Sequence, residues 1–176
     1  QTLSDRQVTE GSEWMPQTSK NENTIQFNYF MGDQLINIKY RDGRKNFKLY
    51  KGAEKVFYNI NSVVGYDWCV VVEGEMDVLA LHEAGIKNAI SVPNGATLNT
   101  NNLDYLDNCI DYLDDKTKII LAVDADAAGQ ALRTEFIRRL GAEVCYLVDF
   151  NGQKDANEYL IENGAEALRD AIHAST

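Results

Sequence analysis

Acidic residues stand directly after two apolar runs in this sequence of 176 residues. Asp124 and Asp126 follow the run IILAV, and Glu73 follows the run WCVVV. Short apolar runs rich in β-branched residues are typical of strands buried on both faces of a parallel sheet, and ligands bind at the carboxyl ends of such strands. Carboxylates packed together there repel one another, and a hard divalent cation relieves the repulsion. The pattern therefore predicts a Mg²⁺ site, with Mn²⁺ as a substitute.

Two further acids are candidates for the same cluster. Asp77 lies in the first turn of a helix predicted after Glu73, and Asp155 lies in the segment KDANEYL. Each acid also has a structural alternative: Asp126 could cap the helix that starts near Ala127, and Asp77 could be a first-turn acid favoured by the helix dipole. Capping does not explain Glu73 and Asp124. The predicted metal ligands are Glu73, Asp77, Asp124, Asp126 and Asp155.

The elements that must position these acids alternate between strand and helix after residue 65. Such alternation predicts an α/β domain whose Rossmann-like parallel sheet is flanked by helices. The patterns predict strands over 68–73, 88–92 and 143–148 with another ending at Asp124, and helices over 76–84, 127–140, about 157–162 and 165–173.

The first part of the chain has a different character. Residues 1–23 are polar without periodicity, which predicts a flexible lead or linker. The segments TIQFNYF, QLINIKYRD, KNFKLYK and VFYNI, separated by turn residues, predict a small antiparallel sheet. We therefore expect a lead over 1–23, a β-rich subdomain over 24–65 and an α/β domain over 66–176.

Charge is distributed unevenly along the chain. The formal net charge is −10, yet residues 36–58 hold seven basic and two acidic residues, so this segment carries +5 and the remainder −15. A basic surface of this kind could bind a polyanion, or its lysines could simply protect an exposed sheet edge. Tyr40, Phe47 and Tyr50 lie between the basic residues and could either stack on bases or pack in the sheet.

Cysteine usage and hydropathy limit other classes. Three separated cysteines support neither a disulfide framework nor a paired-cysteine zinc site. No apolar run approaches the roughly 20 residues of a membrane helix. We expect a soluble protein of the cytoplasm or another intracellular compartment, without a membrane partner.

The motif VVVEGEMDVLAL followed by IILAVDADAAGQAL resembles the Toprim domain. SVPNGA, KDANEYL and the basic segment before them narrow the resemblance to the primase half of the primase-helicases of T-odd phages and of Twinkle-like proteins. It covers about residues 24–171. It implies a Toprim fold that follows a basic subdomain in the chain. Within that fold it implies that Glu73 is a general acid/base or metal ligand, that Asp124 and Asp126 are the metal-binding pair, and that Asp77 and Asp155 are accessory acids. The implied contacts to nucleotide or nucleic acid are Lys39, Lys45 and Lys48, with Arg41 and Lys51 in the same segment.

This resemblance implies a DNA primase domain that makes short RNA primers. Its partners would be a single-stranded DNA template, ribonucleoside triphosphates and a helicase domain in the full-length protein. No zinc-binding cysteine cluster and no Walker A motif occur in the sequence, so the chain is expected to be a fragment, a stand-alone module or a relative that has lost priming. The alternatives are a Toprim nuclease and a catalytically weak DNA-binding module of a replicative helicase.

Overall fold

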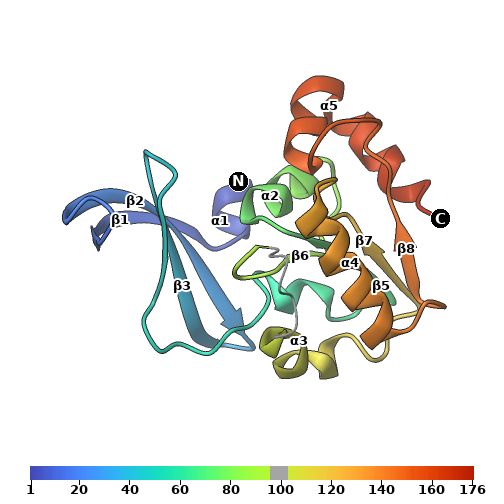
Figure 1. The fold of residues 1–176 in the computed structure, drawn as a ribbon, viewed down its shortest axis with the longest axis horizontal. Helices are drawn as coiled ribbons and strands as arrows, with labels where there is room; N and C mark the ends of the chain where they lie inside the picture. The colour runs from blue at the N-terminus through green and yellow to red at the C-terminus, as the bar shows by residue number, and fades with distance from the viewer. Residues whose placement is uncertain (96–102) are drawn as a thin grey trace.

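The chain folds into two lobes, each built on its own sheet (Figure 1). The structure, a computed structural model, describes residues 1–95 and 103–176. Ala96, the last residue of SVPNGA, lies outside the described residues. The first lobe is an antiparallel sheet and the second is a parallel sheet with helices around it. The predicted α/β class, with a β-rich part before it, is confirmed.

The antiparallel sheet has the strand order β1-β2-β3-β4. The turn between β2 and β3 contains Gly32, whose φ of 58° lies in the left-handed region that glycine adopts without cost. The predicted strand over KNFKLYK is shorter than expected. The strands are β1 (Val8–Met15), β2 (Lys20–Met31), β3 (Gln34–Asp42) and β4 (Phe47–Leu49).

The prediction of a flexible lead over residues 1–23 was wrong. Helix α1 (Thr2–Asp5) and strand β1 lie in this segment, and β1 pairs with β2 over its whole length, from Val8 opposite Phe27 to Met15 opposite Lys20. Most side chains of β1 are exposed or half-buried, and Met15 alone is fully buried. A strand held mainly by backbone hydrogen bonds to one neighbour needs no apolar alternation, so composition could not reveal it.

The segment VFYNI was also predicted as a strand and is not one. Tyr58 forms one isolated bridge with Ser91, and a short 3₁₀ helix, η1 (Ile60–Val63), follows. Val56, Phe57 and Tyr58 are fully buried. The apolar character of this segment therefore reflects burial between the two sheets, which sequence alone cannot distinguish from a buried strand.

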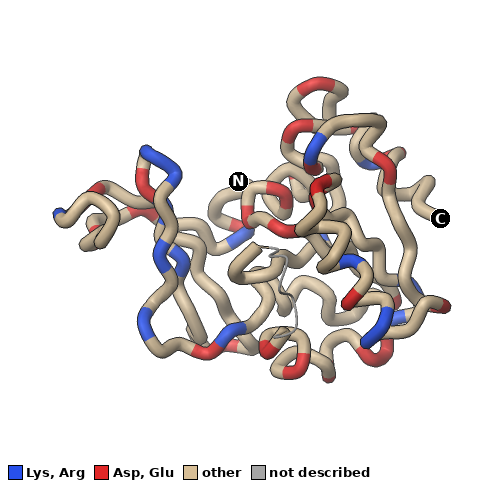
Figure 2. The backbone as a smooth tube through the Cα atoms, viewed as in Figure 1, with Lys and Arg blue, Asp and Glu red and all other residues tan. Residues whose placement is uncertain are grey.

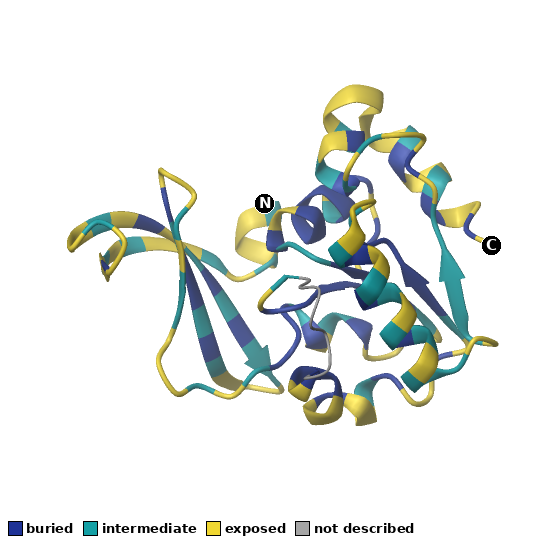
Figure 3. Cartoon of the chain, in the orientation of Figure 1, coloured by how far each residue is buried: buried dark blue, intermediate teal, exposed yellow. Residues whose placement is uncertain are grey.

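The parallel sheet has the order β6-β5-β7-β8, with every neighbouring pair parallel. Figure 3 shows that its central strands, β5 and β7, are buried, which explains their continuous apolar runs. Its strands are β5 (Trp68–Val72), β6 (Ala89–Ser91), β7 (Lys118–Leu121) and β8 (Cys145–Leu147).

The helices of this lobe follow the predicted alternation, with two differences. The short helices α3 (Asp104–Asn108) and η2 (Ile110–Tyr112) were not predicted. The two helices predicted near the end form one element, α5 (Ala156–His173), broken at Gly164, whose φ of 85° and ψ of 170° are not helical. The remaining helices are α2 (Glu75–Glu83) and α4 (Ala127–Leu140).

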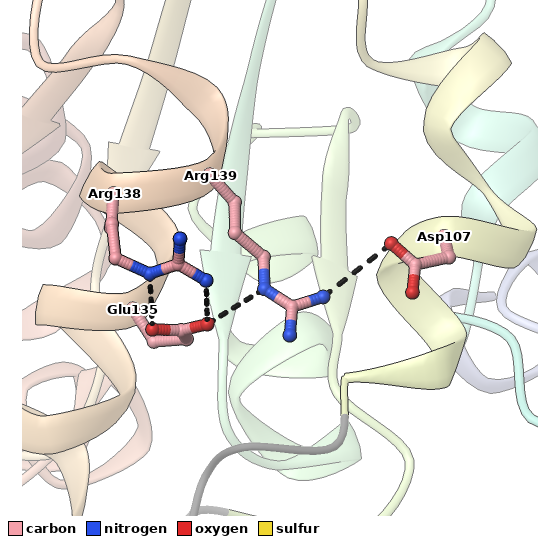
Figure 4. Close-up of polar contacts among 4 residues, drawn as sticks. All are labelled: Asp107, Glu135, Arg138 and Arg139. Carbon is pink, nitrogen blue, oxygen red and sulfur yellow. Dashed lines mark hydrogen bonds and ion pairs between the residues drawn. The ribbon is translucent and has the colours of Figure 1, made fainter.

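An ion-pair network links α3 to α4 (Figure 4). Glu135 accepts hydrogen bonds from Arg138 and Arg139, and Arg139 also pairs with Asp107 at 3.4 Å. Hydrogen bonds from both arginines lower the pKa of Glu135 to about 2. The network fastens the outer helices to each other at the surface.

The two lobes share one hydrophobic core. Phe27 and Tyr29 of β2 belong to the same buried apolar cluster as β5, and Phe57 contacts the rings of Tyr105 and Phe136 at centroid distances of 5.0 and 6.2 Å. We propose the domain boundary near residue 65, with the first 23 residues belonging to the β-rich part. In the described part of the chain, no helix combines the length and hydropathy needed to span a bilayer.

Candidate metal and nucleotide site

Glu73 and Asp124 meet because their strands are parallel neighbours. Val71 of β5 lies opposite Leu121 of β7, so the loops after both strands leave the sheet at the same edge. The backbone N–H of Asp124 donates to Oε1 of Glu73 at 2.9 Å. The juxtaposition that the two apolar runs predicted is therefore present.

Gly129, which the sequence analysis did not single out, makes this contact possible. A Cβ at this position would lie 2.2 Å from the carbonyl oxygen of Asp124 and 2.5 Å from Oε1 of Glu73. Glycine within a helix is otherwise less favourable than alanine, by up to about 1 kcal/mol in a helix interior. That unfavourable choice in DADAAG was the available signal.

Three predicted ligands form a compact acidic cluster. One carboxylate oxygen each from Asp77, Asp124 and Asp155 lies within 4.8 Å of the others. Asp77 comes from the first turn of α2, Asp124 follows β7, and Asp155 caps the N-terminus of α5. The backbone N–H of Asn157 donates to Oδ1 of Asp77 at 2.9 Å, so the start of α5 fixes the spacing of the cluster.

The electrostatics of the cluster favour a cation. Burial, reinforced by the charge of Asp155, raises the pKa of Asp77 to about 7. Burial also raises the pKa of Asp124, against the opposing effect of Lys154, whose Nζ lies 2.7 Å from Oδ2 of Asp124. Ionising three carboxylates so close together is unfavourable unless a cation neutralises them, and carboxylate oxygens are the ligands that Mg²⁺ prefers. The residues present therefore fit a divalent cation.

The two other predicted ligands lie outside this three-carboxylate group. Asp126 is the N-cap of α4, and its Oδ1 accepts from the backbone N–H groups of Ala128 and Gly129 at 3.0 Å each. The capping alternative for Asp126 is thus observed. Glu73 is half-buried beside the group, with Oε1 directed at the backbone of Asp124. Their roles as metal ligands stay predictions.

A buried ion pair joins the two lobes next to the acidic edge. Nζ of Lys39, on β3, lies 2.8 and 3.0 Å from the two carboxylate oxygens of Glu75, on α2. The exposed fractions of the two side chains are 11% and 4%. The hydroxyl of Tyr29 also donates to Glu75, and burial together with the Glu75 charge raises the pKa of this tyrosine. Glu75 was not among the predicted site residues, because its pairing with Lys39 depends on contact between the two lobes.

The predicted basic contacts divide into two groups. Lys39 and Lys48 are engaged inside the protein, because Lys48 pairs with Glu13 and also donates to the carbonyl oxygen of Trp14 at 2.9 Å. Within residues 1–95 and 103–176, no carboxylate pairs with the three other predicted contacts, Arg41, Lys45 and Lys51. Figure 2 shows basic positions recurring along the strands and turns of the first lobe. Those without an ion pair are Arg41, Lys45 and Lys51.

A cavity of about 530 Å³ lies between the basic sheet and the acidic edge. Lys39 and Phe47 line one side, and Glu73, Gly74 and Pro93 are among the residues on the other. A larger cavity of about 850 Å³ opens on another side of the α/β lobe, along β8 and the end of α5, and reaches Asp124. We assign the site to the smaller cavity because it alone, of these two, brings the basic sheet to a strand-end acid, Glu73.

This fold and this acidic edge define a class of protein. Residues 70–160, more than half of the chain, match the family described as Toprim-like, and the chain belongs to this family. It is 37% identical to a "Primase homolog protein" of Arabidopsis thaliana over 86% of this chain and 50% of the relative. It is 33% identical to the "Twinkle homolog protein, chloroplastic/mitochondrial" of the same plant, over 95% of this chain and 26% of the relative.

The solved structures agree on the fold. The primase fragment of the bacteriophage T7 primase-helicase protein superimposes with a TM-score of 0.80 at 24% identity, over 98% of this chain and 69% of that one. The resemblance inferred from the motifs is therefore confirmed. The chain spans half of the first curated relative and about a quarter of the second.

Proposed function

We propose that the chain is the catalytic domain of a DNA primase, which synthesises short RNA primers on single-stranded DNA. The observation that carries this proposal is the cluster of Asp77, Asp124 and Asp155 next to Glu73. Glu73 accepts a hydrogen bond from the backbone of Asp124 and lines a cavity whose opposite wall is the basic sheet. Nucleotidyl transfer requires acidic side chains that hold a divalent cation and basic side chains that bind the phosphates. The relatives named primase and Twinkle homologs support the same substrate class.

In the proposed reaction, the 3′ oxygen of one nucleotide attacks the α-phosphorus of the next. The bond between the α-phosphorus and the bridging oxygen breaks, and pyrophosphate leaves. Mg²⁺ held by Asp77, Asp124 and Asp155 would neutralise the phosphates and acidify the 3′ hydroxyl. Glu73 lines the cavity, and we propose it as the acceptor of the proton.

The other side chains bind and orient the substrates. Arg41, Lys45 and Lys51 have no carboxylate partner in the described part of the chain, so they can contact template or triphosphate phosphates. Such binding weakens as salt rises, because each phosphate contact releases counterions. We propose single-stranded DNA, ribonucleoside triphosphates and a helicase domain of the full-length protein as partners. The intracellular location that the sequence leads us to expect stays a prediction.

A second candidate is a catalytically weak DNA-binding module. The observation that favours it is Lys154, whose ammonium already lies 2.7 Å from Asp124 in the cluster. A protein cation in that position would reduce the affinity of the carboxylates for a metal.

The test is template-dependent ribonucleotide incorporation on mixed-sequence single-stranded DNA with Mg²⁺ or Mn²⁺. Wild type is compared with Asp124→Asn and Asp155→Asn, and with Asp114→Asn as control, because Asp114 is exposed before β7, away from the cluster. The primase proposal expects product in wild type and control and none in the first two variants. Salt-dependent DNA binding without product would favour the binding module, and metal-dependent cleavage of the template would favour a nuclease.

A further inference from the structure

Phe47 is an exposed aromatic residue inside the site cavity. It begins the short edge strand β4, and 46% of its surface is accessible although it lines the cavity with Glu73 and Gly74. Exposed aromatic rings in a pocket with converging polar groups are typical of ligand contacts, since leaving such a ring in water gains nothing for folding.

Two cations lie beside this ring. Nζ of Lys39 is 5.2 Å and Cζ of Arg41 is 5.8 Å from its centroid. Lys39 is neutralised by Glu75, whereas Arg41 has no carboxylate partner in the described part of the chain. An aromatic face next to an uncompensated guanidinium suits a ligand with a flat π-system attached to an anion, which is the chemistry of a nucleotide.

The ring is held on a fixed backbone. Phe47 pairs with Arg41 across β3 and β4, and its carbonyl oxygen accepts a hydrogen bond of 2.8 Å from Nε2 of Gln17, in the turn between β1 and β2. A phenylalanine has only two rotatable side-chain bonds, so an anchored backbone leaves little entropy to lose on binding.

The structure separates Phe47 from the two other aromatic candidates of the basic segment. Tyr40 is only 5% exposed and lies beneath the ammonium of Lys48, at 5.4 Å from its ring centroid, so it belongs to the packed sheet. Tyr50 is 60% exposed but does not line the cavity. Of the three, Phe47 alone combines exposure with a place in the cavity.

We propose that Phe47 is a stacking platform for a nucleobase at the entrance to the site, and that Arg41 contacts the adjoining phosphate. This inference rests on the proposed function and adds to it a base-contacting residue that charge and metal chemistry do not require. The base could belong to the template strand or to the incoming nucleotide, which share the same flat aromatic chemistry.

The experiment measures equilibrium binding of four probes to the 176-residue chain. The probes are a short oligothymidine, the same backbone without bases, ATP and inorganic triphosphate. The proteins are wild type, Phe47→Ala, Phe47→Tyr and the matched control Tyr50→Ala, with thermal unfolding midpoints to confirm that each is folded.

We expect Phe47→Ala to weaken binding of a base-bearing probe by about 5- to 150-fold, the range of one lost stacking contact. The base-free probes should bind equally to wild type and variant, Phe47→Tyr should retain affinity, and Tyr50→Ala should behave as wild type. A loss confined to the oligothymidine would assign the platform to the template, and a loss confined to ATP would assign it to the incoming nucleotide.

Two results would overturn the inference. Equal losses for probes with and without bases would mean that Phe47 acts only on the backbone or on the fold, and unchanged affinity for every probe would mean that it contacts no ligand. Either result leaves the proposed function intact if wild type binds DNA and incorporates ribonucleotides. Wild type that binds no probe would instead remove both proposals.

Discussion

Asp77→Asn should make the metal-free protein more stable at neutral pH. Asp77 is 6% exposed, and its carboxylate lies with Asp124 and Asp155 in the acidic cluster. Burial and the neighbouring negative charges disfavour its ionised form in the folded state. Asparagine retains an oxygen that can accept the hydrogen bond from the backbone N–H of Asn157 and removes the charge.

The size of the effect follows from the pKa. A rise from 3.8 in the unfolded chain to about 7 in the folded protein corresponds to at most about 4 kcal/mol of lost stability when Asp77 is ionised in both states. Because the folded state binds the proton more tightly, the wild type loses this stability as pH rises from about 4 to about 7. The gain from Asp77→Asn should therefore be below about 1 kcal/mol at pH 4 and about 2–4 kcal/mol at pH 8.

Urea denaturation with excess EDTA, at several pH values between 4 and 8, measures this difference directly. Added Mg²⁺ should then stabilise wild type more than Asp77→Asn, because the variant has lost one of the clustered carboxylates. An Asp77→Asn variant that is less stable than wild type at pH 8 without metal, or a difference between them that does not change with pH, would contradict a raised pKa of Asp77.

Three other predictions concern the contacts around the site. Gly129→Ala should lower the free energy of unfolding by about 1–3 kcal/mol, although alanine has the better helix propensity, because the added Cβ would overlap Asp124 and Glu73. Gly43→Ala is the control, since there is open space around Gly43 and no loss is expected. Thermal melts of both variants measure the difference. Glu75→Gln should destabilise by about 3–5 kcal/mol by leaving the ammonium of Lys39 buried without a counter-charge, and the double variant Glu75→Leu with Lys39→Met should recover most of the loss in urea titrations. Glu135→Gln should lower the melting temperature at pH 7, and the difference from wild type should disappear as pH falls from 4.5 to about 2. The reason is that Glu135, whose pKa is lowered in the folded state, stabilises the fold only while its carboxylate is ionised. Calorimetry measures both melting temperatures across this range, and a difference that stays constant would contradict the prediction.

The parallel sheet could be predicted because a strand buried on both faces is a continuous run of apolar residues in the sequence. The apolar runs before Glu73 and Asp124 specify β5 and β7, and parallel strands must bring their carboxyl ends to one edge. The contact between Glu73 and Asp124 follows from that geometry. Asp155 was a candidate from the sequence, although nothing local indicates that α5 begins beside β7.

The remainder depends on contacts between distant residues. Strand β1 is stabilised by the edge of β2, so its own composition is uninformative. Lys39 looked like a solvent-facing base, and only the packing of β3 against α2 reveals that Glu75 neutralises it. Asp126 shows the opposite case, in which a local pattern fitted two roles and the hydrogen bonds identified the cap.

The shared core and the Lys39–Glu75 pair restrict how the two lobes can be recombined. Exchanging the β-rich lobe with that of a relative would bring new side chains against Tyr105 and Phe136, which Phe57 contacts, and a new partner for Glu75. A donor lobe without a cation at the position of Lys39 would leave an unpaired carboxylate in the interface. Chimeras should therefore fold well only when both sides of this interface come from the same parent, even though each lobe has its own sheet.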